Sequence, residues 1–125
     1  MRESIYSDIL DVISEIVPMT WNRLVFRAED SDTMWSYVFY IRRNASYVQC
    51  YEVPELKEDD LDEAFERIRE LITDAREAQD SWNVMTICVT PNGDPAVTFD
   101  CLDENVDRYE YTNEWKRIFL SPESD

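Results

Sequence analysis

The chain has 125 residues, 44% of them hydrophobic and 13% aromatic, which is enough for one globular domain over residues 1–125 with a substantial core. Its 28 acidic and 12 basic side chains give a net charge of −16, which disfavours nucleic acids and anionic membranes and favours basic protein partners, although solubility alone explains such a charge equally well. The chain contains no histidine, which excludes Ser-His-Asp and Cys-His catalytic groups, and its single glycine excludes the glycine-rich loops that bind phosphate.

The first half of the chain predicts one helix and three strands. Apolar residues at helical spacing predict an amphipathic helix from about residue 3 to 17, and the proline that follows ends it. A strand is predicted over residues 21–29, and a second over 34–42, where both faces carry aromatic or aliphatic side chains. A third strand is predicted over residues 47–53, again ended by a proline.

The central helix is predicted over residues 58–81. Asp59 or Asp60 is expected to cap its start, and its outer face carries mostly glutamates and aspartates. Its apolar stripe, at three- and four-residue steps, consists of Leu61, Ala64, Phe65, Ile68, Leu71, Ile72 and Ala75.

The last part of the chain predicts two strands and a short helix. The strands span residues 82–90 and 96–102, and the Pro-Asn-Gly-Asp-Pro sequence between them favours a tight turn. A helix is predicted over residues 111–120, with Trp115, Ile118 and Phe119 facing inward, and residues 121–125 are expected to be a frayed tail.

This element order, α-β-β-β-α-β-β-α, predicts an α+β fold. Short connections favour antiparallel neighbours, so we expect an antiparallel five-stranded sheet. Because strands with two apolar faces need cover on at least one side, the helices are expected to pack on one face of this sheet.

Few residues are suited to catalysis or metal binding. The carboxylate groups at residues 59–63 lack the glycine and the spacing of a calcium loop and are interpreted as helix caps and solvated charge. Asp30 and Asp32 are not expected to bind a metal either, so we expect no catalytic residue, metal or cofactor. Three cysteines in apolar segments, with no metal-type pair, are typical of reduced thiols inside the cell. With no apparent signal peptide or membrane span, the protein is expected to be cytoplasmic.

Aromatic residues are concentrated on the predicted second and third strands. They allow two interpretations, either cross-strand pairs within the core or anchors on a partner-binding surface. The set consists of Trp35, Tyr37, Tyr40, Tyr47 and Tyr51.

The order of these features resembles the YezG-like immunity proteins, which are antitoxins of bacterial polymorphic-toxin systems. The resemblance covers residues 5–102. It rests on the first helix ending Ile16-Val17-Pro18 before Trp21, a strand ending in Ala-Glu, the aromatic strand from Trp35 to Ile41, the step Val53-Pro54 before the acidic helix, Trp82 before a Thr-rich strand, and Asn92-Gly93 before Val97-Thr98-Phe99-Asp100.

The resemblance implies a protein that binds and silences a cognate toxin made by the same cell, commonly a nuclease. A nuclease surface is basic because it holds phosphate, so an acidic protein can occupy it and gain association rate by electrostatic steering. The expected contacts are carboxylates on the central helix and in the loop after the fifth strand, together with the aromatic strand. They are Glu66, Glu70, Glu77, Asp103, Glu104, Asp107, Trp35, Tyr37 and Tyr40.

Two other functions fit the same composition. A homodimeric secretion chaperone would also be small, acidic and cytosolic, and would bind an extended effector protein. An enzyme using carboxylates alone is the third interpretation. The immunity interpretation predicts a folded toxin encoded beside this protein and no direct contact with nucleic acid or membrane, and it favours a monomer.

Overall fold

The computed structural model describes residues 4–17, 21–30, 35–43, 46–75, 82–91, 93–103 and 105–120. Its elements follow the order α-β-β-β-α-β-β-α with one added 3-10 turn, which confirms the predicted α+β class and element order. The chain divides into two compact units. The helical unit comprises Met1–Thr20 and Gln49–Ser81, and the sheet unit comprises Trp21–Val48 and Trp82–Asp125. The single domain over residues 1–125 stays a prediction.

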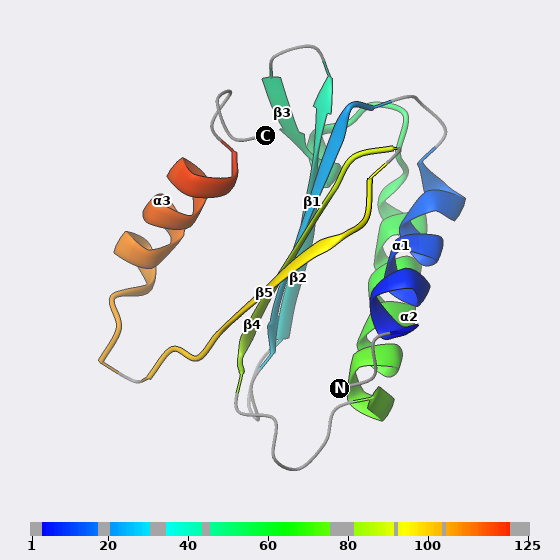
Figure 1. The fold of residues 1–125 in the computed structure, drawn as a ribbon. Coiled ribbons are helices and arrows are strands. Elements are labelled where there is room, and N and C mark those ends of the chain that lie inside the picture. Colours follow the sequence, from blue (N-terminus) through cyan, green and yellow to red (C-terminus); the bar gives the residue numbers. More distant parts are fainter. Residues whose placement is uncertain are drawn as a thin grey trace. The chain divides into compact units, whose positions relative to one another are not determined.

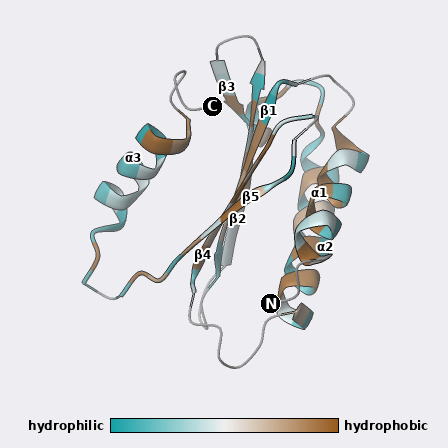
Figure 2. Cartoon of the chain, in the orientation of Figure 1, coloured by the Kyte–Doolittle hydropathy of each residue, from teal (hydrophilic) through white to brown (hydrophobic). Residues whose placement is uncertain are grey.

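Two amphipathic helices, α1 (Ser4–Ile16) and α2 (Glu58–Ala75), pack side by side in the helical unit (Figure 1). Both helices carry hydrophobic and hydrophilic residues in turn along the chain (Figure 2). This pattern lets each helix bury one side and expose the other. At the surface an Arg67 nitrogen lies 2.7 Å from a Glu15 carboxylate oxygen. The buried side chains confirm the predicted stripes except at Leu71, which is only half-buried. They are Ile5, Ile9, Val12 and Ile13 on α1 and Leu61, Ala64, Phe65, Ile68, Ile72 and Ala75 on α2.

The segment before α2 differs from the prediction. The third strand, β3 (Ser46–Gln49), is shorter than expected, because Cys50–Glu52 turns into a single 3-10 helix, η1, and not a continued strand. Within η1 the Tyr51 ring centroid lies 6.0 Å from that of Phe65 on α2. The expected capping by Asp59 or Asp60 is wrong, since α2 already begins at Glu58 and both residues lie in its first turn.

The sheet unit contains β1 (Arg23–Asp30), β2 (Trp35–Arg43), β4 (Val84–Val89) and β5 (Ala96–Asp100), together with residues 46–48 of β3. The strand order in the sheet is β3-β2-β1-β4-β5. Antiparallel pairing of β1 with β2 and β4, and of β4 with β5, confirms the predicted sheet. Between β4 and β5 the Gly93 N–H donates to the Thr90 carbonyl at 3.2 Å, within the predicted turn.

Alternation along β1 gives the sheet two faces. Leu24, Phe26 and Ala28 point to one face and are fully buried, together with Phe39 of β2 and Ile87 of β4, which lie opposite Phe26. Val25 and Arg27 point to the other face, so β1 is the buried centre of the sheet.

The last helix, α3 (Arg108–Phe119), covers the Val25 face of the sheet (Figure 1). The predicted inward position of Trp115 is confirmed, since Trp115 packs in one apolar cluster with Val25 and Tyr40. The predicted inward position of Ile118 is wrong: it is 49% exposed. Helix α3 also begins three residues earlier than expected.

Candidate partner-binding surface

Helix α2 presents a strongly acidic outer face. Its 18 residues include eight carboxylates and two arginines. Glu66 and Glu70, both predicted partner contacts, are exposed one turn apart on this face, and Asp8, Asp11 and Glu15 are exposed on the neighbouring α1. This surface can attract a cationic partner over a distance of about one Debye length. The predicted contact Glu77 lies outside the described residues.

A second group of predicted carboxylates precedes α3 in the sheet unit. Asp103 is exposed, and its Oδ1 accepts the backbone N–H of Asn105 at 2.8 Å. Asp107 is the N-cap of α3, where its Oδ1 accepts the N–H groups of Tyr109 at 2.9 Å and Glu110 at 3.2 Å. Asp107 therefore has a structural role whether or not it touches a partner. Glu104 lies outside the described residues.

Replacing Asp107 with alanine should cost about 1 kcal/mol of stability, because two N–H groups at the start of α3 would lose their acceptor. Asp107→Asn is the matched control, since asparagine also caps helices well and should cost less. Urea denaturation of both variants measures the difference, and equal losses would mean that the negative charge, rather than the cap, matters.

The three predicted aromatic contacts lie in different environments. Trp35, at the start of β2, is 36% exposed, and its ring centroid lies 5.1 Å from that of Tyr37. Tyr37 is buried and its hydroxyl donates to Asp30 Oδ2 at 3.0 Å. Tyr40 is buried on the opposite face, with its ring centroid 5.8 Å from that of Trp115. Trp35 is thus the most accessible of the three to a partner.

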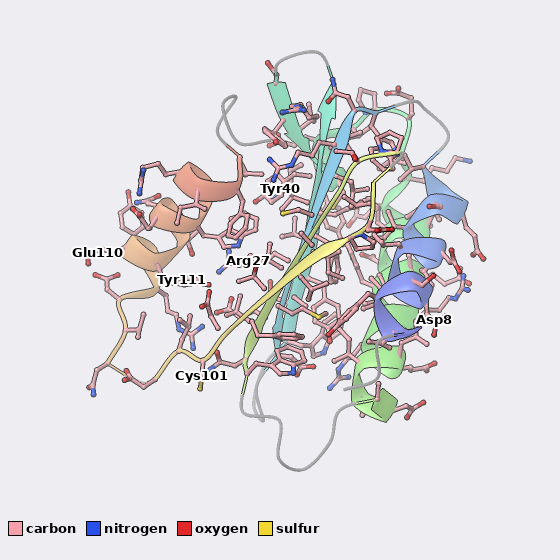
Figure 3. The ribbon with its side chains drawn as sticks, viewed as in Figure 1. Asp8, Arg27, Tyr40, Cys101, Glu110 and Tyr111 are labelled. Carbon is pink, nitrogen blue, oxygen red and sulfur yellow. The ribbon has the colours of Figure 1, made fainter. Side chains whose placement is uncertain are left out.

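A half-buried cation lies between β1 and α3. The Arg27 guanidinium lies 5.1 Å from the Trp115 ring and 5.6 Å from the Tyr111 ring (Figure 3). Its Nε is buried without a hydrogen-bond partner among the described residues, and its Nη2 lies 3.7 Å from Glu29 Oε2. Burial lowers the pKa of the Arg27 guanidinium, an effect partly offset by Tyr111 and Tyr40.

Hydrogen bonds fix α3 along its whole length. The Trp115 indole donates to Thr86 Oγ1 at 2.9 Å in the buried layer, and the Tyr111 hydroxyl donates to Asp100 Oδ2 at 2.7 Å. Burial and this contact with Asp100 raise the pKa of Tyr111. Near the helix end Arg23 donates to the Phe119 carbonyl at 3.2 Å. Helix α3 is therefore a defined surface element of the sheet unit.

These surfaces carry no recognisable reaction centre. Among the described residues no three acidic, cysteine or histidine side chains gather closely enough to hold a metal ion. The three cysteines are free thiols, and burial raises the pKa of Cys88, which makes its thiol less reactive. In the described ranges no helix is long and apolar enough to cross a membrane. The exposed carboxylates and aromatic rings can contact a partner protein.

Comparison with protein families matches residues 2–124 to the family described as Immunity protein YezG-like. The chain belongs to this family. No curated protein matches it. Membership in the YezG-like family confirms the resemblance seen in the sequence, indicates an immunity-protein role, and implies a toxin as the partner. Immunity proteins are generally non-enzymatic, which agrees with the binding surfaces described above.

Two features of this YezG-like protein were missed by sequence reasoning. Tyr109 on α3 is 76% exposed, and the predicted start of α3 at residue 111 had left it in a loop. Arg27 lies within the strand predicted over residues 21–29. A charged residue between the apolar residues Phe26 and Ala28 was the available signal that this side chain has a special environment. Its place under α3 depends on contacts from Tyr111 and Trp115, more than 80 residues further along the chain, which periodicity does not reveal.

Proposed function

We propose that this protein binds a cognate toxin with nuclease activity, made by the same cell, and holds it inactive in a tight cytoplasmic complex. The observation that carries the proposal is the family match over nearly the whole chain. The net charge of −16 supports it, because a nuclease domain must present cationic side chains to phosphate. The same match favours this role over that of a secretion chaperone.

The proposed contacts are the exposed members of the predicted set. On the helical unit these are Glu66 and Glu70, and Glu77 is proposed with them from its place in the sequence. On the sheet unit they are Trp35, Asp103 and Asp107, and Glu104 is proposed with them from its place in the sequence. Tyr37 and Tyr40 are proposed to contribute indirectly. Tyr37 packs against the Trp35 ring, and Tyr40 packs against Trp115 of α3, so both hold surface elements in place.

The first test is inhibition of the toxin domain encoded beside this protein. An equimolar amount of this protein should abolish cleavage of DNA or RNA by that domain, and this protein alone should cleave neither. Light scattering on the mixture should show a complex with the toxin. Cleavage that continues at saturating amounts of this protein would refute the proposal, whereas an extended effector bound by a homodimer would support the chaperone.

Reversing charge on α2 should slow the encounter with the toxin. In Glu66→Lys/Glu70→Lys the association rate at low salt should fall by about tenfold, because rim charges act mainly through steering, and the rate should depend less on ionic strength. Dissociation should change less. Stopped-flow measurements at several salt concentrations give both quantities.

Two further variants serve as controls for this measurement. Glu66→Gln/Glu70→Gln removes the charge without reversing it and should give an intermediate rate. Asp103→Lys tests the loop without disturbing the cap at Asp107. Should the α2 variants leave both rate and salt dependence unchanged, the acidic face is only solvated, and Trp35 becomes the better candidate contact.

A further inference from the structure

Strand β5 forms one edge of the sheet. It pairs with β4 over five consecutive residues, and β4 is its only strand neighbour within the described part of the chain. Four of its residues are exposed, Phe99 to 40%, and Val97 is half-buried. The outer side of β5 therefore presents backbone N–H and C=O groups that no described strand pairs.

Proteins usually protect such an edge with lysine, proline, a bulge or a very short strand. The sequence Ala-Val-Thr-Phe-Asp of β5 contains neither lysine nor proline, and its register with β4 has no bulge. The opposite edge strand, β3, has four residues and ends directly in η1. Of the two edges, β5 is the one open to another strand.

The side chains of β5 differ between the two faces of the sheet. Thr98 and Asp100 lie on the face covered by α3, where Asp100 accepts the Tyr111 hydroxyl. Val97 and Phe99 lie on the other face, and the Phe99 ring centroid is 5.5 Å from that of Trp82. A strand added beside β5 would place apolar side chains next to Val97 and Phe99 and polar ones next to Thr98 and Asp100.

The negative charge around β5 indicates which polar side chains an added strand should carry. Between residues 94 and 107 the sequence has five carboxylates and no lysine or arginine. A second copy of this acidic chain would bring carboxylates against carboxylates, so self-pairing is disfavoured. A strand with lysine or arginine at alternate positions would complement the edge at both ends.

We propose that β5 binds an extended segment of the toxin as an added antiparallel or parallel strand, in which apolar side chains alternate with basic ones. This inference rests on the proposed function and states how the toxin is held. Main-chain hydrogen bonds to β5 would supply affinity, and the alternation of apolar and basic side chains would supply specificity.

Hydrogen exchange on the complete protein, free and bound to the toxin domain encoded beside it, tests the proposal. In the complex, alternate amides of residues 96–100 should exchange at least about tenfold more slowly, because only every second N–H of an edge strand points outward. A complex with unchanged exchange over β5 would overturn this inference and leave the proposed function intact. If no complex forms, both fail.

A charged side chain on the edge gives an independent test. Phe99→Lys adds a protective lysine to β5 and should weaken toxin binding by about tenfold or more, since it removes an exposed aromatic contact and places a charge among the apolar side chains of the added strand. Asn113→Lys, exposed on α3, makes the same charge change away from β5 and should have little effect. Equal affinities of the two variants would overturn the proposal, and circular dichroism checks that Phe99→Lys remains folded.

Discussion

Replacing Trp115 with alanine should lower the free energy of unfolding by about 3–5 kcal/mol. The side chain is only 2% exposed and fills the space between α3 and the sheet, with ring contacts to Tyr40 and Phe119. Its loss would leave a cavity, remove the hydrogen bond to Thr86 and uncover the Arg27 guanidinium. Chemical denaturation followed by circular dichroism measures the change.

Two variants calibrate this result. Trp115→Phe keeps much of the apolar contact but leaves the Thr86 hydroxyl without its indole donor, so its cost should be smaller than that of alanine. Ile118→Ala, on the exposed side of the same helix, should change stability by no more than about 0.5 kcal/mol. A loss below about 1 kcal/mol for Trp115→Ala would contradict the packing of α3 described above.

In the helical unit, Phe65→Ala and Ile68→Ala should each cost about 2–5 kcal/mol. Both side chains are buried on the stripe of α2, Ile68 completely, so truncation leaves a cavity that the two packed helices fill only in part. Phe65→Ala also removes the ring contact with Tyr51.

The control for these variants is Glu66→Ala, which lies between them on the exposed face of α2 and should cost no more than about 0.5 kcal/mol. Thermal or urea denaturation compares the three proteins. If Glu66→Ala proved as destabilising as Ile68→Ala, the apolar stripe would not be the packed face of the helix.

Periodicity predicted the elements well but not the positions where local turns compete with it. Residues 47–53 have the composition of one strand, yet the chain forms a 3-10 turn at Cys50–Glu52. Cys50 is buried within this turn, and Val53 is buried directly after it in an extended conformation. At α3 the sequence Asp-Arg-Tyr-Glu contained a capping signal, and treating Asp107 only as a surface charge placed the helix start too late.

The candidate contacts were harder to predict than the fold. Alternation along β2 places Tyr37 and Tyr40 on opposite faces, but it does not show that α3, far along the chain, covers Tyr40. The surface charge on α2 was predictable, because burial of the apolar stripe of an amphipathic helix leaves its charged face exposed. Which exposed patch a partner selects is not encoded in periodicity, because interfaces of this kind are about as apolar as the remaining surface.

The division into two units gives each of them its own spectroscopic signal. All four tryptophans, at positions 21, 35, 82 and 115, belong to the sheet unit, so fluorescence excited selectively in tryptophan reports on that unit. Far-ultraviolet ellipticity is dominated by α1 and α2, with 13 and 18 residues against 12 in α3. A single unfolding experiment recorded with both probes therefore measures whether the two units melt as one cooperative body, as a single domain requires.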